Sequence, residues 1–297
     1  MTTFPSILRD IKSIKIQGAQ NVAKAATKAI SLISSEYKTS PKLLSYLAKA
    51  KELLIKTRST EPEMRNVLNF LTYNLKSFDN PYRELIKRHA IINKHFDRVR
   101  HEIITIGTRK IKTGSIIFTH CHSSTVTGIL LQAKSEKKEF TVYNTETRPL
   151  FQGRITAKEL ARAHIPVVHF VDSAGRLAMK EADIMLIGAD AISSEGKVFN
   201  KIGSEMFAEF ADKYDVPLYV CTDSWKFDPL TIFGYEEEIE RRPGKEVWPT
   251  APEGVKIDNR AFEKISPDLI TGIISELGVY KPEIFIEEVR RNYPWMF

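Results

Sequence analysis

Residues Ser115–His122 read SIIFTHCH, and the interpretation of the whole chain starts from this stretch. Its first five residues are apolar, β-branched or small, and they favour a strand. His120, Cys121 and His122 follow directly, and the apolar segment TGILLQAK at 127–134 then has helical character. Open α/β sheets present their chemistry in this way, because ligands bind outside the carboxyl ends of parallel strands. The stretch therefore predicts a buried strand with Cys121 at a functional edge.

The composition is that of an ordinary globular protein. With 297 residues, 42% hydrophobic and 27% charged, the chain can bury one large core or two smaller ones. Two cysteines exclude a disulfide framework and favour a reducing compartment. There is no apolar run of 18 residues, and MTTFPSILRD lacks the apolar core of a signal peptide. We therefore expect a cytoplasmic protein with no membrane partner.

The net charge is +7 and the isoelectric point is near 9.2. This balance is compatible with nucleic acid or with a phosphorylated small substrate. The basic residues are spread among many glutamates, and no zinc-type cysteine spacing, RNA-binding aromatic signature or internal repeat is present. The GxGxxG fingerprint, the Walker A loop and the hydrolase nucleophile elbow are also missing. Usual NAD binding and nucleoside triphosphate hydrolysis are therefore not expected.

Helical periodicity dominates the first 105 residues or so, and it predicts four segments. They are 7–34, interrupted at Gly18; 40–58, with Ser40 as N-cap and Pro41 in the first position; 58–76, with Thr60 as cap and Pro62 just inside; and 81–111.

From Lys112 onward, strand-like runs alternate with helical ones, which predicts βαβ units and a parallel sheet. The strand candidates are 115–120, 140–145, 167–172, 183–190 and 217–223. Residues 268–278 are compatible with a helix or a last strand, and the amphipathic tail 280–297 is expected to cover a sheet edge or to join a subunit interface. We predict an α/β protein with a helical N-terminal domain, residues 1–110, followed by a Rossmann-like domain, residues 111–297.

Strand ends supply the candidate site, because parallel strands bring their carboxyl ends to one edge. Cys121 is compatible with an inert core position or with a reactive thiolate. A following helix N-terminus and the flanking imidazoles would lower its pKa. His120 and His122 alternate along one segment, so at most one of them faces the site. The other strand-end residues are Glu146 to Arg148, Asp172, Asp190 and Asp223, for which helix capping (Asp172, Asp223) and a turn role (Asp190) are the structural alternatives.

Several segments suit a phosphate group. Gly18 and Gly153 allow backbone N–H groups to approach an anion. Five basic residues stand near turns or element ends, where they would bind phosphate or simply be solvated: Arg58, Arg148, Arg154, Lys201 and Lys226. We predict no metal at the His-Cys-His run, because it lacks further ligands at tight spacing.

Six motifs then occur in order and resemble one superfamily: THCHSS at 119–124, NTETRPLFQGR at 144–154, VDSA at 171–174, GADAI at 188–192, NKIGS at 200–204 and SWKF at 224–227. This superfamily joins the alpha, beta and delta regulatory subunits of the translation-initiation guanine-nucleotide exchange factor, methylthioribose-1-phosphate isomerase and archaeal ribose-1,5-bisphosphate isomerase. The resemblance covers nearly the whole chain, and the TETRP and VDSA forms are most similar to ribose-1,5-bisphosphate isomerase.

The resemblance implies an aldose–ketose isomerase that converts ribose 1,5-bisphosphate to ribulose 1,5-bisphosphate in AMP salvage, with Cys121 and Asp190 as catalytic residues. It implies a homo-oligomer built from dimers, as in a hexamer, and no metal or organic cofactor. The alternatives are a regulatory subunit that binds initiation factor 2, a methylthioribose-1-phosphate isomerase and, on charge alone, a nucleic-acid-binding protein. The predicted substrate-binding residues are Gln17, Gly18, Ala19, Gln20, Arg58, Arg148, Asn200, Lys201 and Lys226.

The expected mechanism uses Cys121 as a thiolate that removes the C2 proton and Asp190, kept protonated by burial, as the acid for the ring or carbonyl oxygen. A hydride shift is the alternative route. The isomerases resembled here carry arginine where this chain has Gln17, and the loss of that phosphate partner lends weight to the regulatory alternative.

Overall fold

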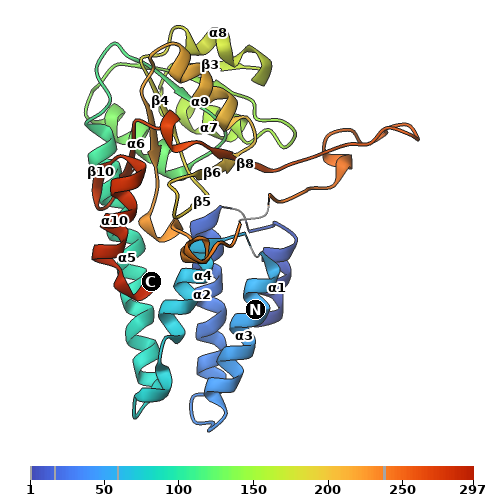
Figure 1. Cartoon of the computed structure of the whole chain (residues 1–297), viewed down its shortest axis with the longest axis vertical. Coiled ribbons are helices and arrows are strands. Elements are labelled where there is room, and N and C mark those ends of the chain that lie inside the picture. The colour runs from blue at the N-terminus through green and yellow to red at the C-terminus, as the bar shows by residue number, and fades with distance from the viewer. Residues whose placement is uncertain (1, 17, 59, 237–238) are drawn as a thin grey trace.

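The computed structural model describes residues 2–16, 18–58, 60–236 and 239–297, and an all-helical first half precedes a half built on a sheet (Figure 1). The helices of the first half are α1 (Phe4–Lys12), α2 (Ala19–Glu36), α3 (Leu43–Thr57), α4 (Pro62–Thr72) and α5 (Pro81–Thr108). Gly18, the N-cap of α2, has φ +82°, a conformation that glycine adopts without strain. The predicted interruption at Gly18 is thus confirmed.

Two predicted helix starts need correction. The third helix begins at Leu43 after Lys42, so Ser40 and Pro41 form a preceding turn in which the Ser40 hydroxyl accepts the Lys42 N–H. The N-cap of α4 is Glu61 and not Thr60, because Pro62, with its fixed φ, is the first residue of that helix.

A seven-stranded sheet forms the centre of the second half, and its order is β10-β9-β7-β4-β1-β2-β3. All neighbours are parallel except β9 and β10. The six parallel strands follow the Rossmann order 3-2-1-4-5-6 when they are counted along the chain as β1, β2, β3, β4, β7 and β9. The predicted fold class is therefore confirmed. The strand bounds are β1 (Ile116–Thr119), β2 (Thr141–Thr145), β3 (Val167–Phe170), β4 (Ile184–Ile187), β7 (Leu218–Cys221), β9 (Gly272–Ser275) and β10 (Gly278–Tyr280). Residues 268–278, ambiguous in the sequence, thus supply strands.

Helices cover the sheet: α6 (Ser124–Ser135), α7 (Gly153–Arg162), α8 (Gly175–Met179), α9 (Ser204–Lys213) and α10 (Pro282–Asn292). The tail helix α10 packs against β9 and the edge strand β10. The tail therefore covers a sheet edge, which is the first of its two predicted roles. None of the helices in the described ranges is both long and apolar enough to cross a membrane.

β1 and β4 are neighbours at the middle of the sheet, and the chain leaves them in opposite directions. From β1 it continues to β2 and β3, whereas from β4 it continues toward β7 and β9. Such a topological switch opens a crevice at the carboxyl ends of the two strands. Cys121 follows β1 and Asp190 follows β4, so both predicted catalytic residues stand at this crevice.

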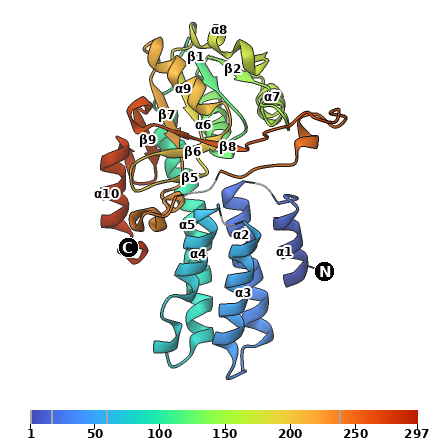
Figure 2. The ribbon, with the colours of Figure 1, turned by 45° about the vertical axis from the view of Figure 1, so that its right-hand side comes forward.

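A small antiparallel sheet, missed in the sequence, lies beside the crevice. It consists of β5 (Ala191–Ile192), β6 (Val198–Lys201) and β8 (Phe262–Ile265). Residues 239–261, which precede β8, form an arm that extends away from the rest of the molecule (Figures 1 and 2).

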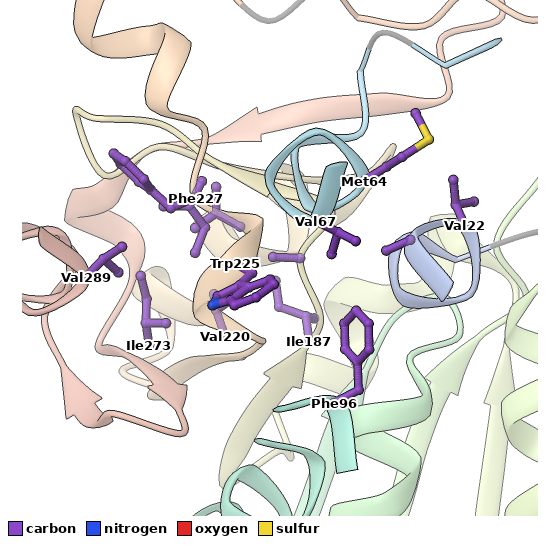
Figure 3. Packing of buried hydrophobic residues seen from close by; sticks show 14 of the residues in the cluster. Val22, Met64, Val67, Phe96, Ile187, Val220, Trp225, Phe227, Ile273 and Val289 are labelled. Carbon is purple, nitrogen blue, oxygen red and sulfur yellow. The ribbon is translucent and has the colours of Figure 1, made fainter. Parts of the chain in front are cut away.

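One buried cluster contains residues of both halves. Figure 3 shows Val22 of α2, Val67 of α4 and Phe96 of α5 facing Ile187 of β4 and Trp225, which follows β7. Strands begin to alternate with helices between Thr108 and Ile116, close to the expected boundary. The division into two domains at residue 110 stays a prediction, because the halves share this core.

Candidate active site

Cys121 is held by its backbone at the end of β1. Its φ is +66°, which is unusual for a residue with a side chain and typical of residues that the surrounding structure constrains. The Cys121 N–H donates to the Thr147 hydroxyl at 3.0 Å, and the Cys121 carbonyl accepts from the Thr156 hydroxyl at 2.9 Å. The thiol therefore starts from a fixed backbone position.

Asp172 fixes the loop that holds Cys121. Its carboxylate accepts the N–H groups of Thr147 and Arg148 at 2.8 and 2.7 Å, and Thr147 in turn contacts Cys121. Asp172 makes no side-chain cap bond, so the capping alternative does not apply to it. The capping alternative does apply to Asp223, whose side chain accepts the Trp225 N–H at the start of a 3₁₀ turn.

Only one of the two flanking histidines faces the cavity, as predicted. His120 is buried, and its ring nitrogens contact the Thr145 hydroxyl at 2.5 Å and the Ile202 carbonyl at 2.8 Å. Burial lowers the pKa of His120 to about 4, so the ring is neutral and structural. His122 lines the cavity, and its Nδ1 contacts the Thr156 hydroxyl at 3.1 Å. Both imidazole rings thus form hydrogen bonds with other groups of the protein.

The expected direction of the Cys121 pKa shift is wrong. Burial raises the pKa of this thiol to about 11, and Asp190 and Asp172 raise it further, while Lys201 and the His122 N–H lower it. Neutral imidazoles supply no positive charge, so the predicted stabilisation of the thiolate by both histidines is not present. Lys201 is the main cation that favours the thiolate.

A cavity of about 380 Å³ brings most of the predicted site residues together. Cys121 and Asp190 both line it, and the Asp190 N–H is fixed by the Phe199 carbonyl at 2.8 Å. The predicted binding residues that line it are Gly18, Ala19, Gln20, Arg58, Asn200, Lys201 and Lys226. Gln17 lies outside the described residues.

Arg148 does not line the cavity, and its predicted binding role stays a prediction. Its guanidinium lies over the Phe151 ring and donates to the Val247 carbonyl at 3.3 Å. Arg154 is also turned away, because it pairs with Glu146 at 3.1 Å. Gly153 serves packing: a Cβ there would lie 1.7 Å from the Thr145 carbonyl oxygen. This close approach of α7 to the end of β2, and not an anion, explains the glycine.

Among the described residues, positive and negative side chains are balanced around the cavity. Six basic residues of this part of the chain line it: Arg58, Arg100, Lys201, Lys226, Arg242 and Arg260. Six acidic residues of the same part line it as well: Glu61, Glu63, Asp190, Asp223, Glu240 and Glu246. Several of these lining residues form ion pairs with one another. Arg58, for example, contacts Glu61 at 2.8 Å and Glu240 at 3.3 Å.

Burial shifts this balance toward positive charge. It raises the pKa of Glu61 to about 7, against the lowering effect of Arg58, and that of Glu63 well above 4.5. Both carboxyl groups are therefore wholly or partly neutral near pH 7.

Sequence patterns did not predict four residues that line the cavity: Glu61, Glu63, Glu240 and Arg242. Glu61 and Glu63, at the N-cap and in the first turn of α4, precede an apolar run, where acidic side chains normally lie on the surface and are stabilised by the helix dipole. The two residues of the arm reach the cavity only because β8 pairs with β6. The acidic pair beside Pro62 was the one available signal, since it lies three and five residues after the predicted phosphate ligand Arg58.

One group among the described residues could offer ligands to a metal ion: His95, Asp223 and Glu276, whose ligand atoms lie within 4.8 Å of one another. The His95 ring stacks on Trp225 with centroids 3.9 Å apart, and its Nε2 lies 3.5 Å from the Asp223 carboxylate. Glu276 accepts a hydrogen bond from the Tyr293 hydroxyl at 2.9 Å.

Known proteins match this chain along nearly its whole length. A model of the initiation factor 2 subunit family matches residues 15–282. A Pyrococcus furiosus protein named ribose 1,5-bisphosphate isomerase is 36% identical, in an alignment that covers 98% of this chain and 94% of that protein. A Thermotoga maritima protein named methylthioribose-1-phosphate isomerase is 33% identical, in an alignment that covers 97% of this chain and 89% of that protein. The crystal structure of translation initiation factor eIF-2B from Pyrococcus horikoshii OT3 matches with a TM-score of 0.85 and 29% identity, over 95% of this chain and 98% of that one.

Proposed function

Because the chain belongs to the initiation factor 2 subunit family, we propose that it is an aldose–ketose isomerase that converts ribose 1,5-bisphosphate to ribulose 1,5-bisphosphate. The observation that carries the proposal is the joint position of Cys121 and Asp190, which follow neighbouring strands and line one cavity. The relatives that bear this activity in their names add support. The cations Arg58, Lys201 and Lys226 suit the two phosphate groups.

The reaction moves one proton from C2 to C1 and changes no net oxidation state. Asp190, as the acid, protonates the ring oxygen while the C1–O4 bond breaks, and the Cys121 thiolate removes the C2 proton to give an enol phosphate. The thiol then returns a proton to C1, and the Asp190 carboxylate accepts the proton of the C2 hydroxyl as the ketone forms. Each group ends in the state in which it began.

The primary test is to incubate the protein with ribose 1,5-bisphosphate and to measure ribulose 1,5-bisphosphate. We expect Cys121→Ser and Asp190→Asn each to lower kcat by about 10²-fold or more. Cys221→Ala is the matched control, because this second cysteine is the buried last residue of β7 and does not line the cavity. Full activity of Cys121→Ser would remove the mechanism.

Solvent deuterium separates the two chemical routes. Proton transfer through Cys121 places deuterium at C1 as far as the thiol exchanges with heavy water before it returns its proton, whereas a hydride shift carries the C2 hydrogen directly to C1. Deuterium at C1 would therefore exclude the hydride route.

The second candidate is a regulatory subunit that binds initiation factor 2. It is favoured by the match to the eIF-2B structure and by the ion pairs in which Glu61 and Glu240 occupy Arg58. It predicts stable binding to the alpha subunit of that factor, unchanged by Cys121→Ser, and no turnover of ribose 1,5-bisphosphate. Methylthioribose 1-phosphate is the alternative substrate to include in the same assay.

Two further points belong to the proposal. We infer a homo-oligomer built from dimers, up to a hexamer, which light scattering at defined protein concentration tests. A relative of lower identity, eIF2B beta–delta from Chaetomium thermophilum, is described as a tetrameric complex. A cytoplasmic location and a role in AMP salvage stay predictions.

A further inference from the structure

Glu63 has unused hydrogen-bonding capacity inside the cavity. It lies on the first turn of α4, is completely buried and lines the cavity, yet neither carboxyl oxygen has a partner within the described ranges. Its neighbour Glu61 differs in one oxygen, because Glu61 Oε1 forms an ion pair with the Arg58 guanidinium at 2.8 Å, whereas Glu61 Oε2 also has no partner within the described ranges. Lys226, the basic residue with the largest electrostatic effect on Glu63, donates instead to the Ala189 carbonyl at 2.6 Å.

Stability does not explain why this group is buried. A buried polar group without a partner destabilises the folded state, and a buried carboxylate does so more strongly. The dipole of α4 favours an acidic residue in its first turn, but an exposed side chain would gain that benefit without being desolvated. A carboxyl group that is costly to bury and makes no internal bond is typical of a site that a ligand completes.

The charge state of Glu63 narrows the chemistry of that ligand. Burial raises its pKa well above 4.5, Asp223 and Glu61 raise it further, and Lys226 and Lys24 oppose them. The neutral carboxyl group that results has one O–H donor and one carbonyl acceptor. This pair matches a hydroxyl group, which accepts and donates at once.

Resting on the proposed function, we infer that Glu63 determines specificity by binding the 3-hydroxyl group of the sugar, donating one hydrogen bond to it and accepting another. Ribose 1,5-bisphosphate has two free hydroxyl groups, at C2 and C3. The reaction turns the first into a ketone, so the second is the one that a binding residue can hold from substrate to product.

The test compares ribose 1,5-bisphosphate with its 3-deoxy analogue in four proteins: wild type, Glu63→Gln, Glu63→Leu and the control Met64→Leu. Met64 is the next residue of α4 and lies in the core without lining the cavity (Figure 3). We expect wild type and Met64→Leu to prefer the natural substrate by about 10-fold or more in kcat/KM. Glu63→Gln keeps a donor and an acceptor, and should retain this preference within about threefold.

Glu63→Leu should lose the preference, chiefly through KM, while its melting temperature equals or exceeds that of wild type. The inference is overturned if Glu63→Leu still discriminates like wild type. It is also overturned if this variant loses kcat/KM equally for both sugars and has a lower melting temperature than wild type, since a structural role would have that effect.

Binding measurements separate this inference from the proposed function. Calorimetry on the Cys121→Ser background gives the affinity for both sugars without turnover. If wild type binds the sugars but converts neither, the isomerase proposal fails, and the 3-hydroxyl preference in affinity still decides the role of Glu63. If neither sugar binds, both proposals fail.

Discussion

The reactivity of Cys121 is predicted to rise steeply with pH. Burial raises its pKa to about 11, so at pH 7 the thiolate fraction is about one in 10⁴, because each pH unit below the pKa lowers this fraction tenfold. Between pH 7 and pH 9 the fraction therefore rises about 100-fold. We expect the rate of alkylation by iodoacetamide to follow this increase without a plateau.

Mass spectrometry of the alkylated peptide measures the rate at Cys121 separately from Cys221, whose pKa burial raises to about 12. Lys201→Met removes the cation that favours the thiolate and should slow alkylation at every pH. Lys197→Met is the matched control, because this exposed residue pairs with Glu195 just before β6. A rate that levels off below pH 8 would refute the argument from burial, since the thiol would then titrate at or below its ordinary pKa.

Three other predictions concern stability. Asp228→Ala removes the 2.7 Å ion pair with the buried Arg65 and should lower the free energy of unfolding in urea by about 1.5–3 kcal/mol; no loss would contradict the role of this pair. Gly153→Ala forces a Cβ against the Thr145 carbonyl and should cost about 1–3 kcal/mol, with an unchanged melting temperature as the opposing result. Burial raises the pKa of Glu276 to about 7, so the stability it contributes is complete below pH 4.5 and is lost as pH rises through 7. That loss, up to about 3 kcal/mol by pH 8, should be smaller in Glu276→Gln when unfolding is measured across this range.

The main sheet and the meeting of Cys121 with Asp190 could be predicted from sequence. Both follow from local signals: apolar β-branched runs define the strands, and parallel order brings successive strand ends to one edge. Short strands such as β8 could not be predicted, because Phe262 pairs with Lys201 across 61 residues of sequence. Local patterns carry no information on such pairing.

Burial was the second property that the sequence did not reveal. An aspartate followed by serine, as at Asp172, has the same pattern whether it caps a helix or, as here, accepts two N–H groups of a distant loop. The pKa of Cys121 depends on what packs around it, and so does the lack of a partner for Glu63 among the described residues, so both could be assigned only from coordinates.

The 28-residue helix α5, about 42 Å long, makes three different contacts along its length. Because the helix is continuous, the direction of each of these contacts is fixed relative to the other two. Phe96 points into the shared core, Val99 and Ile103 line the cavity, and the last turns pack against α6. One added or deleted residue in its first turns would rotate everything downstream by about 100°. An insertion or deletion should therefore be tolerated better in the arm and the loops than in α5.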